Sequence, residues 1–362
     1  MQLEEKSKKI LIICPHPEGF VPGQRLKFEQ YYSTWIKSGY VITISSFMSP
    51  KFQKIVYKKG HLFSKILGTL HGYYIRIKDI FRIKNFDIVY IFLWVTPFGL
   101  PFFEYVYCLL AKKVVYDIDD LIYLKKTSPA NKLISFLKSS KKPFFLIKKA
   151  DHVLVSTTYL YSEAIKNNSK VTIIPATINL KNYPVREYNS IKKVVIGWSG
   201  SHTTSKYLNQ LNDVLEILSN QFNIEIHIMG DDDFDTQNIK NIKLIKWSSD
   251  YEINALMNFD IGIHPVDFDD WSLGKSGGKL VQYMAASLPI VATLNEPNKL
   301  AIIDNETGFL VSTIEEWKEK LTLLITDNET RKKISIRSRK RAEKIYSIEA
   351  NKDKYLNIFE NL

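Results

Sequence analysis

The sequence has only two cysteines among its 362 residues, Cys14 and Cys108, and both lie in apolar surroundings. Two such cysteines make neither a disulfide framework nor a zinc site, so we expect a protein of a reducing cytosol. Low-complexity tracts are also absent, and the 45% hydrophobic content is typical of a globular chain with room for two cored domains. The charged N-terminus lacks the apolar region of a secretory signal, so we expect none.

A membrane-spanning helix is not expected either. The uncharged stretch 88–103 is shorter than the roughly 20 apolar residues that a span requires. Pro97, Gly99 and Pro101 interrupt it, and Glu104 closes it. The pattern therefore predicts a strand, a turn and then a helix over residues 102–111.

Negative charge is scarce in the first half of the chain. Residues 1–185 carry 28 Lys and Arg against 12 Asp and Glu, a net charge of +16, whereas residues 186–362 carry 22 against 26, a net charge of −4. This asymmetry predicts an anionic partner for the first half, either nucleic acid or anionic lipid.

Two basic segments are the candidates for that contact. Residues 58–84 place apolar side chains at helical spacing between basic ones, which is typical of a helix on an anionic membrane or of a plain surface helix packed on the core. Residues 125–149 mix lysines with aliphatic and aromatic residues. Because no nucleic-acid-binding motif accompanies them, we expect membrane contact there rather than RNA.

Alternating strand and helix patterns predict an α/β protein with two doubly wound domains. In the first domain, apolar runs such as 10–14 and 86–93 are typical of buried parallel strands. The pattern restarts near residue 185. We expect domains at 1–185 and 186–346, followed by an amphipathic helix over 347–362.

The stretch 261–293 predicts a strand, an acidic loop, a helix and a second strand, with the run GKSGGK at 274–279 before the helix. A glycine-rich, lysine-flanked helix start attracts anions through its free N–H groups and the helix dipole, so we expect a diphosphate there. The alternative is an ordinary turn with solvated lysines. The run is not a Walker A loop, because leucine occupies positions 273 and 280.

Two loops that follow predicted strands are further candidate sites. In the first domain, Gly23 and Arg25 of the run PGQR could meet a substrate, although a structural loop explains them equally well. In the second domain, Ser199 and Gly200 begin a loop of small residues that could hold phosphate or sugar. Trp247, at the end of a later strand, could frame a base.

A strand of the first domain ends in three carboxylates, Asp117, Asp119 and Asp120. They could hold Mg²⁺ against a nucleotide diphosphate, because Mg²⁺ takes carboxylate and phosphate oxygens. They could also act on a sugar without a metal, or cap the following helix.

Together these pieces resemble a GT-B glycosyltransferase of family GT4, in a bacterial subgroup with a DxDD motif in the first domain and GWxGS in the second. The matching runs are PGQR (22–25), YDIDDLIY (116–123), IGWSGSHTTSKYL (196–208), GIHPVDFDDWSLGKSGGKLVQYMAASLPIVAT (262–293), TGFLV (307–311), EEW (315–317) and YSIEAN (346–351). The resemblance implies two Rossmann-like domains facing across a cleft. The donor would bind the C-terminal domain, and the acceptor and the membrane the N-terminal one.

The resemblance also implies roles for individual residues. Lys275 and Lys279 would hold the donor diphosphate and stabilise the leaving nucleotide, and Asp119 would act near the sugar, so these three are the expected catalytic residues. Asp120 and His16 would lie on the acceptor side. The expected donor-binding residues are Gly23, Arg25, Ser199, Gly200, Trp247, Ser276, Gly277, Gly278 and Gln282.

The chain departs from the family at this site. Relatives have a pair of glutamates where this sequence has Gly274 and Gln282, so no carboxylate at these positions grips the sugar or ribose hydroxyls. Gln282 can still hydrogen-bond the ribose. Ser287 stands where relatives often have a glycine.

We therefore expect an enzyme that moves a sugar from a nucleotide-diphosphate-sugar donor to a lipid-linked or polysaccharide acceptor. The resemblance places it in bacterial surface-glycan assembly (lipopolysaccharide, O-antigen, capsule or exopolysaccharide) or in protein-glycan assembly. It implies retaining, metal-independent transfer without a cofactor, by a cytoplasmic protein peripheral on the inner face of the plasma membrane, with no nucleic-acid partner.

Two alternatives stay open. A nucleotide-sugar epimerase of the same fold would need acid and base carboxylates, and the missing glutamates disfavour it. A non-catalytic subunit of a membrane glycosyltransferase is the other alternative, against which Lys275, Lys279 and the GWSGS run argue.

Overall fold

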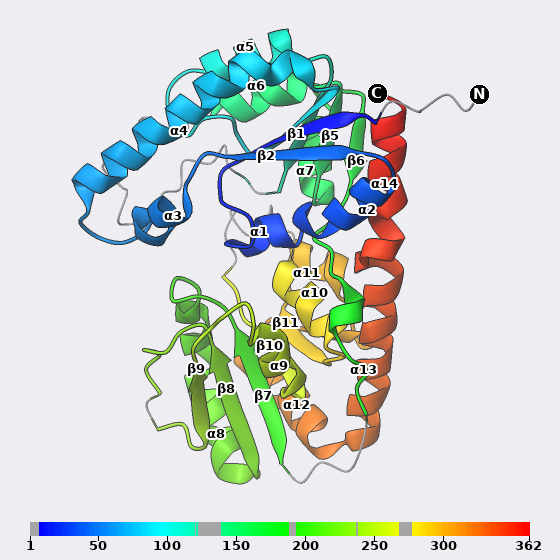
Figure 1. Ribbon diagram of the computed structural model, residues 1–362. Coiled ribbons are helices and arrows are strands. Elements are labelled where there is room, and N and C mark those ends of the chain that lie inside the picture. The colour runs from blue at the N-terminus through cyan, green and yellow to red at the C-terminus, as the bar shows by residue number, and fades with distance from the viewer. Residues whose placement is uncertain (1–6, 120, 122–138, 188–192, 237, 268–276) are drawn as a thin grey trace. The chain divides into compact units, whose positions relative to one another are not determined.

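A computed structural model describes residues 7–119, 121, 139–187, 193–236, 238–267 and 277–362. Contacts divide the chain into two units, which Figure 1 shows with their elements labelled. The first unit contains the described residues up to Ala176 together with Asn351–Leu362, and the second contains those between Thr177 and Ala350. No helix in the described ranges has both the length and the apolarity that a bilayer span requires.

The first unit is built on a parallel six-stranded sheet in the order β2-β1-β3-β4-β5-β6. Its strands are β1 (Lys9–Cys14), β2 (Val41–Ser46), β3 (Ile88–Phe92), β4 (Val114–Ile118), β5 (His152–Val155) and β6 (Val171–Ile173). The central strands β3 and β4 are buried along their whole length, as continuous apolar runs predict. The register pairs Ile10 of β1 with Ile42 of β2 and with Ile88 of β3.

Helices connect these strands, as the right-handed crossovers of a parallel sheet require. They are α1 (Pro22–Arg25), α2 (Tyr32–Lys37), α3 (Pro50–Val56), α4 (Leu62–Arg82), α5 (Phe102–Leu110), α6 (Lys141–Lys149) and α7 (Thr158–Ala164). The predicted helix over 102–111 is confirmed as α5, and the strand before it as β3. The basic segment 58–84 consists mainly of α4, a single helix of 21 residues.

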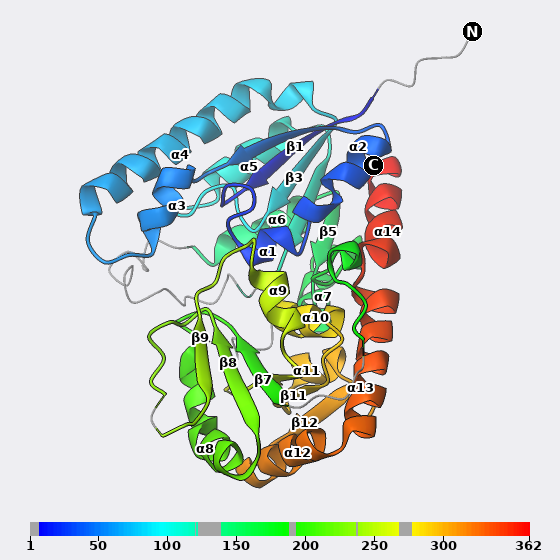
Figure 2. The same cartoon turned by 60° about the horizontal axis from the view of Figure 1, so that its bottom comes forward.

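The last helix, α14 (Ile348–Glu360), completes the core of the first unit and lies beside α2 in both Figure 1 and Figure 2. The rings of Tyr355 and Phe359 pack against the indole of Trp35 on α2, with centroid distances of 5.2 and 5.0 Å. Tyr355 also lies 4.7 Å from the ring of Tyr31. The ammonium of Lys8 donates to the carbonyl of Phe359 at 2.9 Å, so the end of the chain is fixed to its beginning.

The second unit contains another parallel six-stranded sheet, in the order β12-β11-β10-β7-β8-β9. Its strands are β7 (Val194–Ser199), β8 (Ile224–Met229), β9 (Ile242–Ile245), β10 (Ile261–His264), β11 (Ile290–Thr293) and β12 (Gly308–Val311). Its helices are α8 (Asn212–Gln221), α9 (Glu252–Met257), α10 (Gly278–Ala285), α11 (Glu296–Ala301), α12 (Ile314–Thr326) and α13 (Asn328–Arg341).

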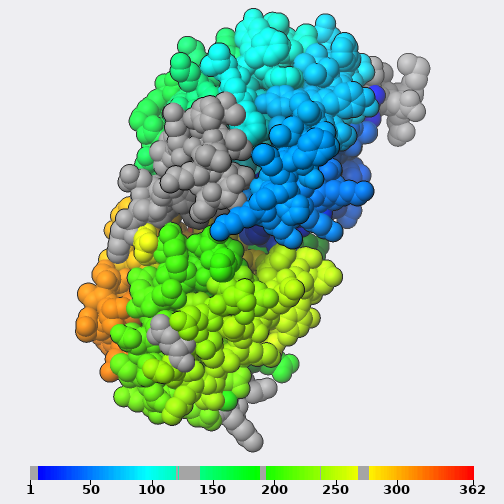
Figure 3. Space-filling model, turned by 90° about the vertical axis from the view of Figure 1, so that its left-hand side faces the viewer, coloured from blue at the N-terminus to red at the C-terminus, as the bar shows by residue number. Residues whose placement is uncertain are grey.

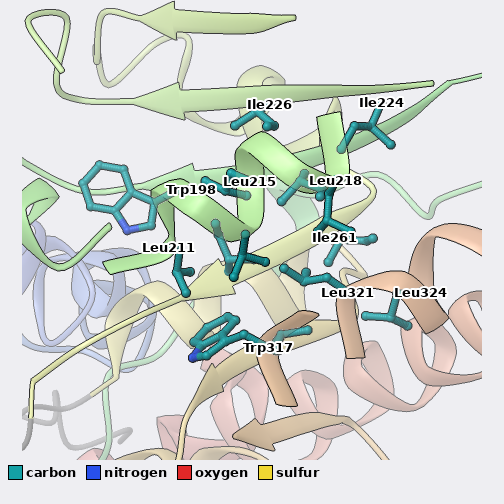
Figure 4. Close-up of a cluster of buried hydrophobic side chains, with 14 of the residues drawn as sticks. Trp198, Leu211, Leu215, Leu218, Ile224, Ile226, Ile261, Trp317, Leu321 and Leu324 are labelled. Carbon is teal, nitrogen blue, oxygen red and sulfur yellow. The ribbon is translucent and has the colours of Figure 1, made fainter. Parts of the chain in front are cut away.

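A core cluster lies between this sheet and its helices (Figure 4). Leu211, Leu215 and Leu218 contribute from α8 and the turn before it, and Trp317 contributes from α12. Trp198 of β7 lies at the edge of the cluster in the view of Figure 4. The core therefore extends to the end of β7, where the predicted loop of small residues begins.

The contact boundary between the units falls at Ala176, before the predicted boundary at residue 185. The reason is that Ile178 is tied to the other end of the second unit. Its N–H donates to the carbonyl of Tyr346 at 2.8 Å, and its carbonyl accepts from the N–H of Ile348 at 3.2 Å. Arg339 of α13 adds a bond to the carbonyl of Tyr183 at 3.3 Å.

Each sheet has one point at which the strand order reverses. In the first unit the chain adds β2 on one side of β1 and then continues on the other side with β3. In the second unit β8 and β9 lie on one side of β7, and β10, β11 and β12 on the other. Ligands of open α/β sheets bind at the carboxyl ends of the strands beside such a point.

Candidate active site

In the second unit the reversal point is occupied by the side chain of Tyr283, a buried residue of α10. Its hydroxyl accepts the N–H of Ser199 at 2.7 Å and lies 3.4 Å from the carbonyl of Ile263, to which it donates. The ring lies against Gly262, where a β-carbon would be 2.7 Å from a ring carbon. One hydroxyl therefore joins the ends of β7 and β10, where the two strands separate.

The first three amides around the end of β7 donate hydrogen bonds to other groups of the protein. Ser199 donates to Tyr283, Gly200 donates to the carbonyl of Met229 at 2.9 Å, and Ser201 donates to the hydroxyl of Thr204 at 3.1 Å. We expected Ser199 and Gly200 to bind the donor. Because their amides are engaged, Ser199 and Gly200 do not offer backbone N–H groups to an anion in this structure.

A lysine on α10 supplies such a side chain. The ammonium of Lys279 lies 3.2 Å from the hydroxyl oxygen of Thr204 and 4.8 Å from the ring centroid of Trp198. α10 begins at Gly278, and its N-cap, Gly277, adopts a left-handed φ of 67°. Gly277 has no side chain to satisfy the first N–H groups of the helix. Lys279 is the second residue of α10, so it lies at the positive end of the helix dipole.

The other residues that we expected to bind the donor differ in their surroundings. Gln282 is buried within α10. Trp247 follows the edge strand β9, and its indole N–H donates to the carboxylate of Glu252 at 2.8 Å. Gly274, Lys275 and Ser276 lie outside the described residues. The described site of the second unit therefore centres on Lys279, with Trp198 and Thr204 beside it.

In the first unit, Gln24 of α1 fixes the loop after β1. Its side-chain oxygen accepts the N–H of His16 at 2.9 Å, and its amide nitrogen donates to the carbonyl of His16 at 3.0 Å and to Glu29 at 2.9 Å. The Nδ1 atom of His16 lies 2.8 Å from the side-chain oxygen of Gln53. Burial lowers the pKa of His16, so its imidazole is neutral at pH 7.

The structure brings together two expected residues of the first unit, Gly23 and Asp119. A β-carbon on Gly23 would lie 3.6 Å from an oxygen of Asp119, so the exposed turn of α1 approaches the carboxylate that follows β4. Arg25, the last residue of α1, is half-buried next to this turn. Asp120 lies outside the described residues.

Asp117 does not belong to an exposed carboxylate cluster. It is fully buried, its Oδ1 atom lies 3.1 Å from the ammonium of Lys27, and it accepts a hydrogen bond from the hydroxyl of Tyr90. Burial raises the pKa of Asp117, while Lys27 and Tyr90 oppose that shift. The ion pair with Lys27 disfavours a magnesium site built on Asp117 and Asp119, because Asp117 already has a cationic partner. Within the described ranges, no group of three or more His, Cys, Asp or Glu side chains is placed to hold a metal ion.

Residues 185–341 match the model of the family described as glycosyl transferases group 1. Among solved structures, sucrose-phosphate synthase from Thermosynechococcus elongatus has a TM-score of 0.71 at 12% identity, covering 98% of both chains. This similarity in fold extends over both parallel-sheet units of the chain. The fold is GT-B.

Two further matches were found. HepE from Anabaena, in complex with UDP-glucose, has a TM-score of 0.67 at 12% identity, over 98% of this chain and 100% of that one. A trehalose synthase from Pyrococcus horikoshii is 26% identical over 130 residues. That match spans 33% of this chain and 31% of the length of the synthase. At these identities the solved structures show the fold of this chain.

The GT-B fold explains part of what the sequence suggested about the site. Lys279 at the start of α10, the loop after β7 and the carboxylate after β4 all lie at the carboxyl edges of the two sheets. Lys27, Tyr283 and Thr204 were missed. A lysine in a continuous amphipathic pattern or a tyrosine on a buried helix face gives no signal of its partner, so only the three-dimensional contacts could find them.

Proposed function

We propose that this protein transfers a sugar from a nucleoside-diphosphate sugar to a lipid-linked or polysaccharide acceptor. The second unit binds the donor nucleotide, and the first unit binds the acceptor. The product belongs to bacterial surface glycan, such as lipopolysaccharide, O-antigen, capsule or exopolysaccharide, or to a protein glycan. The observation that carries the proposal is Lys279, held beside the amino end of α10 at the reversal point of the second sheet in a chain of GT-B fold.

The chemistry requires a group that stabilises the leaving diphosphate. The bond from the anomeric carbon to the phosphate oxygen breaks, and the nucleoside diphosphate leaves with the electron pair. The acceptor oxygen forms the new glycosidic bond, and its proton passes to a phosphate oxygen of the leaving nucleoside diphosphate. Negative charge grows on the departing phosphate, and a fixed ammonium together with a helix dipole stabilises it more in the transition state than in the bound donor.

The remaining roles follow the family resemblance. Lys275 and Ser276 hold the diphosphate with Lys279. Gly23 and Arg25 of the first unit are further candidates for donor binding. Asp119 acts near the sugar, and transfer is retaining and needs no metal. His16 and Asp120 serve the acceptor. Gln282 takes the place of one missing glutamate toward the ribose.

The donor is the first thing to test. Purified protein is screened with a panel of nucleoside-diphosphate sugars for release of the nucleoside diphosphate, beginning with UDP-sugars because HepE was solved with UDP-glucose. Lys279→Ala should lower the transfer rate about a hundredfold or more. The matched control is Lys193→Ala, since Lys193 precedes β7 at the opposite edge of the same sheet and pairs with Glu225. A normal rate for Lys279→Ala contradicts the site, and absent nucleotide binding by calorimetry favours a non-catalytic subunit.

We further propose that the protein works in the cytoplasm, peripheral on the inner face of the plasma membrane. α4 exposes a row of apolar side chains among its basic ones, including Phe63 at 74% and Phe81 at 84%. α5 lies beside α4 in Figures 1 and 2 and adds Phe102 and Leu109, each 66% exposed. Figure 3 shows the face on which α3 and the start of α4 (blue) reach the surface.

The second basic segment contributes less apolar surface in its described part. α6 buries Pro143, Leu146 and Ile147, and its Lys142 is bound to the hydroxyl and the carbonyl of Thr96 at 2.6 and 2.9 Å. Residues 125–138 lie outside the described ranges. We therefore assign the lipid contact to α4 and α5, where exposed apolar and basic side chains occur together.

Vesicle flotation tests this assignment. The protein should bind vesicles that contain anionic lipid and bind purely zwitterionic vesicles weakly, and salt should weaken the binding. The double variant Phe63→Asp, Phe81→Asp should no longer bind the anionic vesicles. Val185→Asp is the control, because Val185 is 79% exposed in the second unit. Equal binding by the double variant and the control would refute the membrane face.

A further inference from the structure

We infer that Trp198 is a positioning residue, which holds the ammonium of Lys279 in the place where it meets the donor diphosphate. This inference rests on the proposed function, because it assigns Trp198 a part in the same site. The family resemblance names the lysine and the loop after β7. It assigns no role to the indole of Trp198.

The first observation is the contact itself. Trp198 is the fifth residue of β7, is 1% exposed, and belongs to the core cluster of the second unit. The ammonium of Lys279 lies 4.8 Å from its ring centroid, within the range of a cation–π interaction, for which tryptophan is the best partner. One face of the indole is therefore presented to the lysine while the rest of the side chain is anchored in the core.

Two glycines make that arrangement possible. A β-carbon on Gly200 would lie 2.1 Å from a ring carbon of Trp198 and 2.8 Å from the nitrogen of Lys279. Gly230 has a φ of +97°, and its β-carbon would lie 2.1 Å from the carbonyl oxygen of Gly200. Any other residue at either position would displace the ring, the ammonium or the loop between them. The backbone of the loop is thus shaped around the Trp198–Lys279 contact.

Thr204 sets the direction of the ammonium. Its hydroxyl oxygen lies 3.2 Å from the nitrogen of Lys279, and the same hydroxyl is fixed by the N–H of Ser201 at 3.1 Å and the carbonyl of Ser201 at 3.0 Å. The indole face and a fixed hydroxyl together restrict a side chain that otherwise has many rotamers. Because a fixed charge needs no reorganisation when the diphosphate leaves, this restriction is expected to raise the transfer rate.

The experiment compares two substitutions of Trp198 with a matched substitution elsewhere in the core. Trp198→Leu removes the aromatic face, and Trp198→Phe keeps a ring. Trp317→Leu is the control, because Trp317 is a buried tryptophan of the same cluster, on α12 (Figure 4). We expect Trp198→Leu to lower kcat by roughly 3- to 30-fold with a smaller change in KM. Trp198→Phe should recover part of the loss, and Trp317→Leu should lower thermal stability without this change in kcat.

A double-mutant cycle separates this inference from the proposed function. In the Lys279→Ala background, Trp198→Leu should have no further effect on kcat or on UDP affinity by calorimetry. If Lys279→Ala is impaired but Trp198→Leu adds its full effect to it, or if Trp198→Leu behaves like Trp317→Leu, the positioning role is overturned and the function stands. If Lys279→Ala binds UDP and turns over normally, the assignment of Lys279 to the site fails and the positioning role of Trp198 fails with it. If the parent protein neither binds a nucleotide nor transfers a sugar, the proposed function fails instead.

A last readout needs no substrate. Brief acetylation followed by mass spectrometry measures how readily the amine of Lys279 reacts. Removing the indole should raise the acetylation rate of Lys279 several-fold in Trp198→Leu, because the ring favours the charged and restrained ammonium. Trp198→Phe should stay near the parent rate, and Lys193 should be unchanged in every variant. An unchanged rate for Lys279 in Trp198→Leu would overturn the inference even for a protein whose donor is unknown.

Discussion

Replacing Lys27 by methionine should destabilise the first unit strongly, and in a manner that depends on pH. Lys27 and Asp117 are both fully buried, so solvent does not screen their attraction. Lys27 also donates to the carbonyl of Ile174 at 2.5 Å. Removing one partner of such a pair leaves an uncompensated buried charge, which costs about 3–5 kcal/mol.

The sign of the pH dependence follows from Asp117. Burial raises its pKa, and the nearby Lys27 ammonium is the largest opposing cause, so Lys27→Met raises the pKa further. The folded variant then binds a proton more tightly than the unfolded chain. Its stability consequently falls as pH rises through the raised pKa of Asp117, and part of the lost stability returns on acidification.

Hydrogen exchange at the amides of β4 (Val114–Ile118) measures this effect locally, which suits a chain with two units. At about pH 7.5, exchange through unfolding should speed up by roughly two to four orders of magnitude in Lys27→Met. The difference should shrink at about pH 5, after correction for intrinsic exchange rates. Adding Asp117→Asn to Lys27→Met should also reduce the loss, because the buried charge is then gone.

Lys112→Met is the control for this prediction. Lys112 lies 2.9 Å from Asp87 in the same unit, but their side chains are 55% and 38% exposed, so the loss should be below about 1 kcal/mol. Equal effects of Lys27→Met and Lys112→Met would refute the reasoning. A penalty that grows on acidification would refute it as well.

Three further predictions concern backbone strain and metal dependence. Ser287→Gly should stabilise the second unit by about 1 kcal/mol in thermal unfolding, because Ser287 has a φ of 57°; a loss of stability contradicts this. Gly230→Ala should cost clearly more than Gly39→Ala, since both have positive φ but only Gly230 faces a close atom; equal unfolding temperatures contradict this. Glycosyl transfer should survive EDTA, because Lys27 engages Asp117; activity lost on chelation and restored by Mg²⁺ would show a metal site.

Much of the fold could be predicted from local patterns. The run 10–14 became β1, the stretch 86–93 contains β3, and the restart near residue 185 leads into a second parallel sheet. Apolar runs between helical patterns suffice for this, because a buried parallel strand must be apolar on both faces. The family resemblance then explained Ser287, whose left-handed conformation ends α10 at a position where relatives often have glycine.

The sites were harder to predict because their contacts join distant segments. The proximity of Gly23 and Asp119 could be anticipated, since both follow strands of one sheet. The sequence pattern could not tell Asp117 from Asp119, although one is a buried partner of Lys27 and the other follows the strand end. Likewise, nothing in the local sequence shows that the hydroxyl of Tyr283 accepts a hydrogen bond from the N–H of Ser199. Pairings of this kind depend on the register and on helix rotation.

The packing of α14 has a consequence for the order in which the protein forms on the ribosome. The second unit is drawn from residues 177–273 and 277–350, so all of its residues have been made once Ala350 has emerged. Most of the first unit is synthesised earlier, yet its aromatic core around Trp35 lacks Tyr355 and Phe359 until residues 355–359 are made. The second unit therefore has its residues before the first unit has gained the rings of Tyr355 and Phe359, and the core around Trp35 is incomplete during that interval.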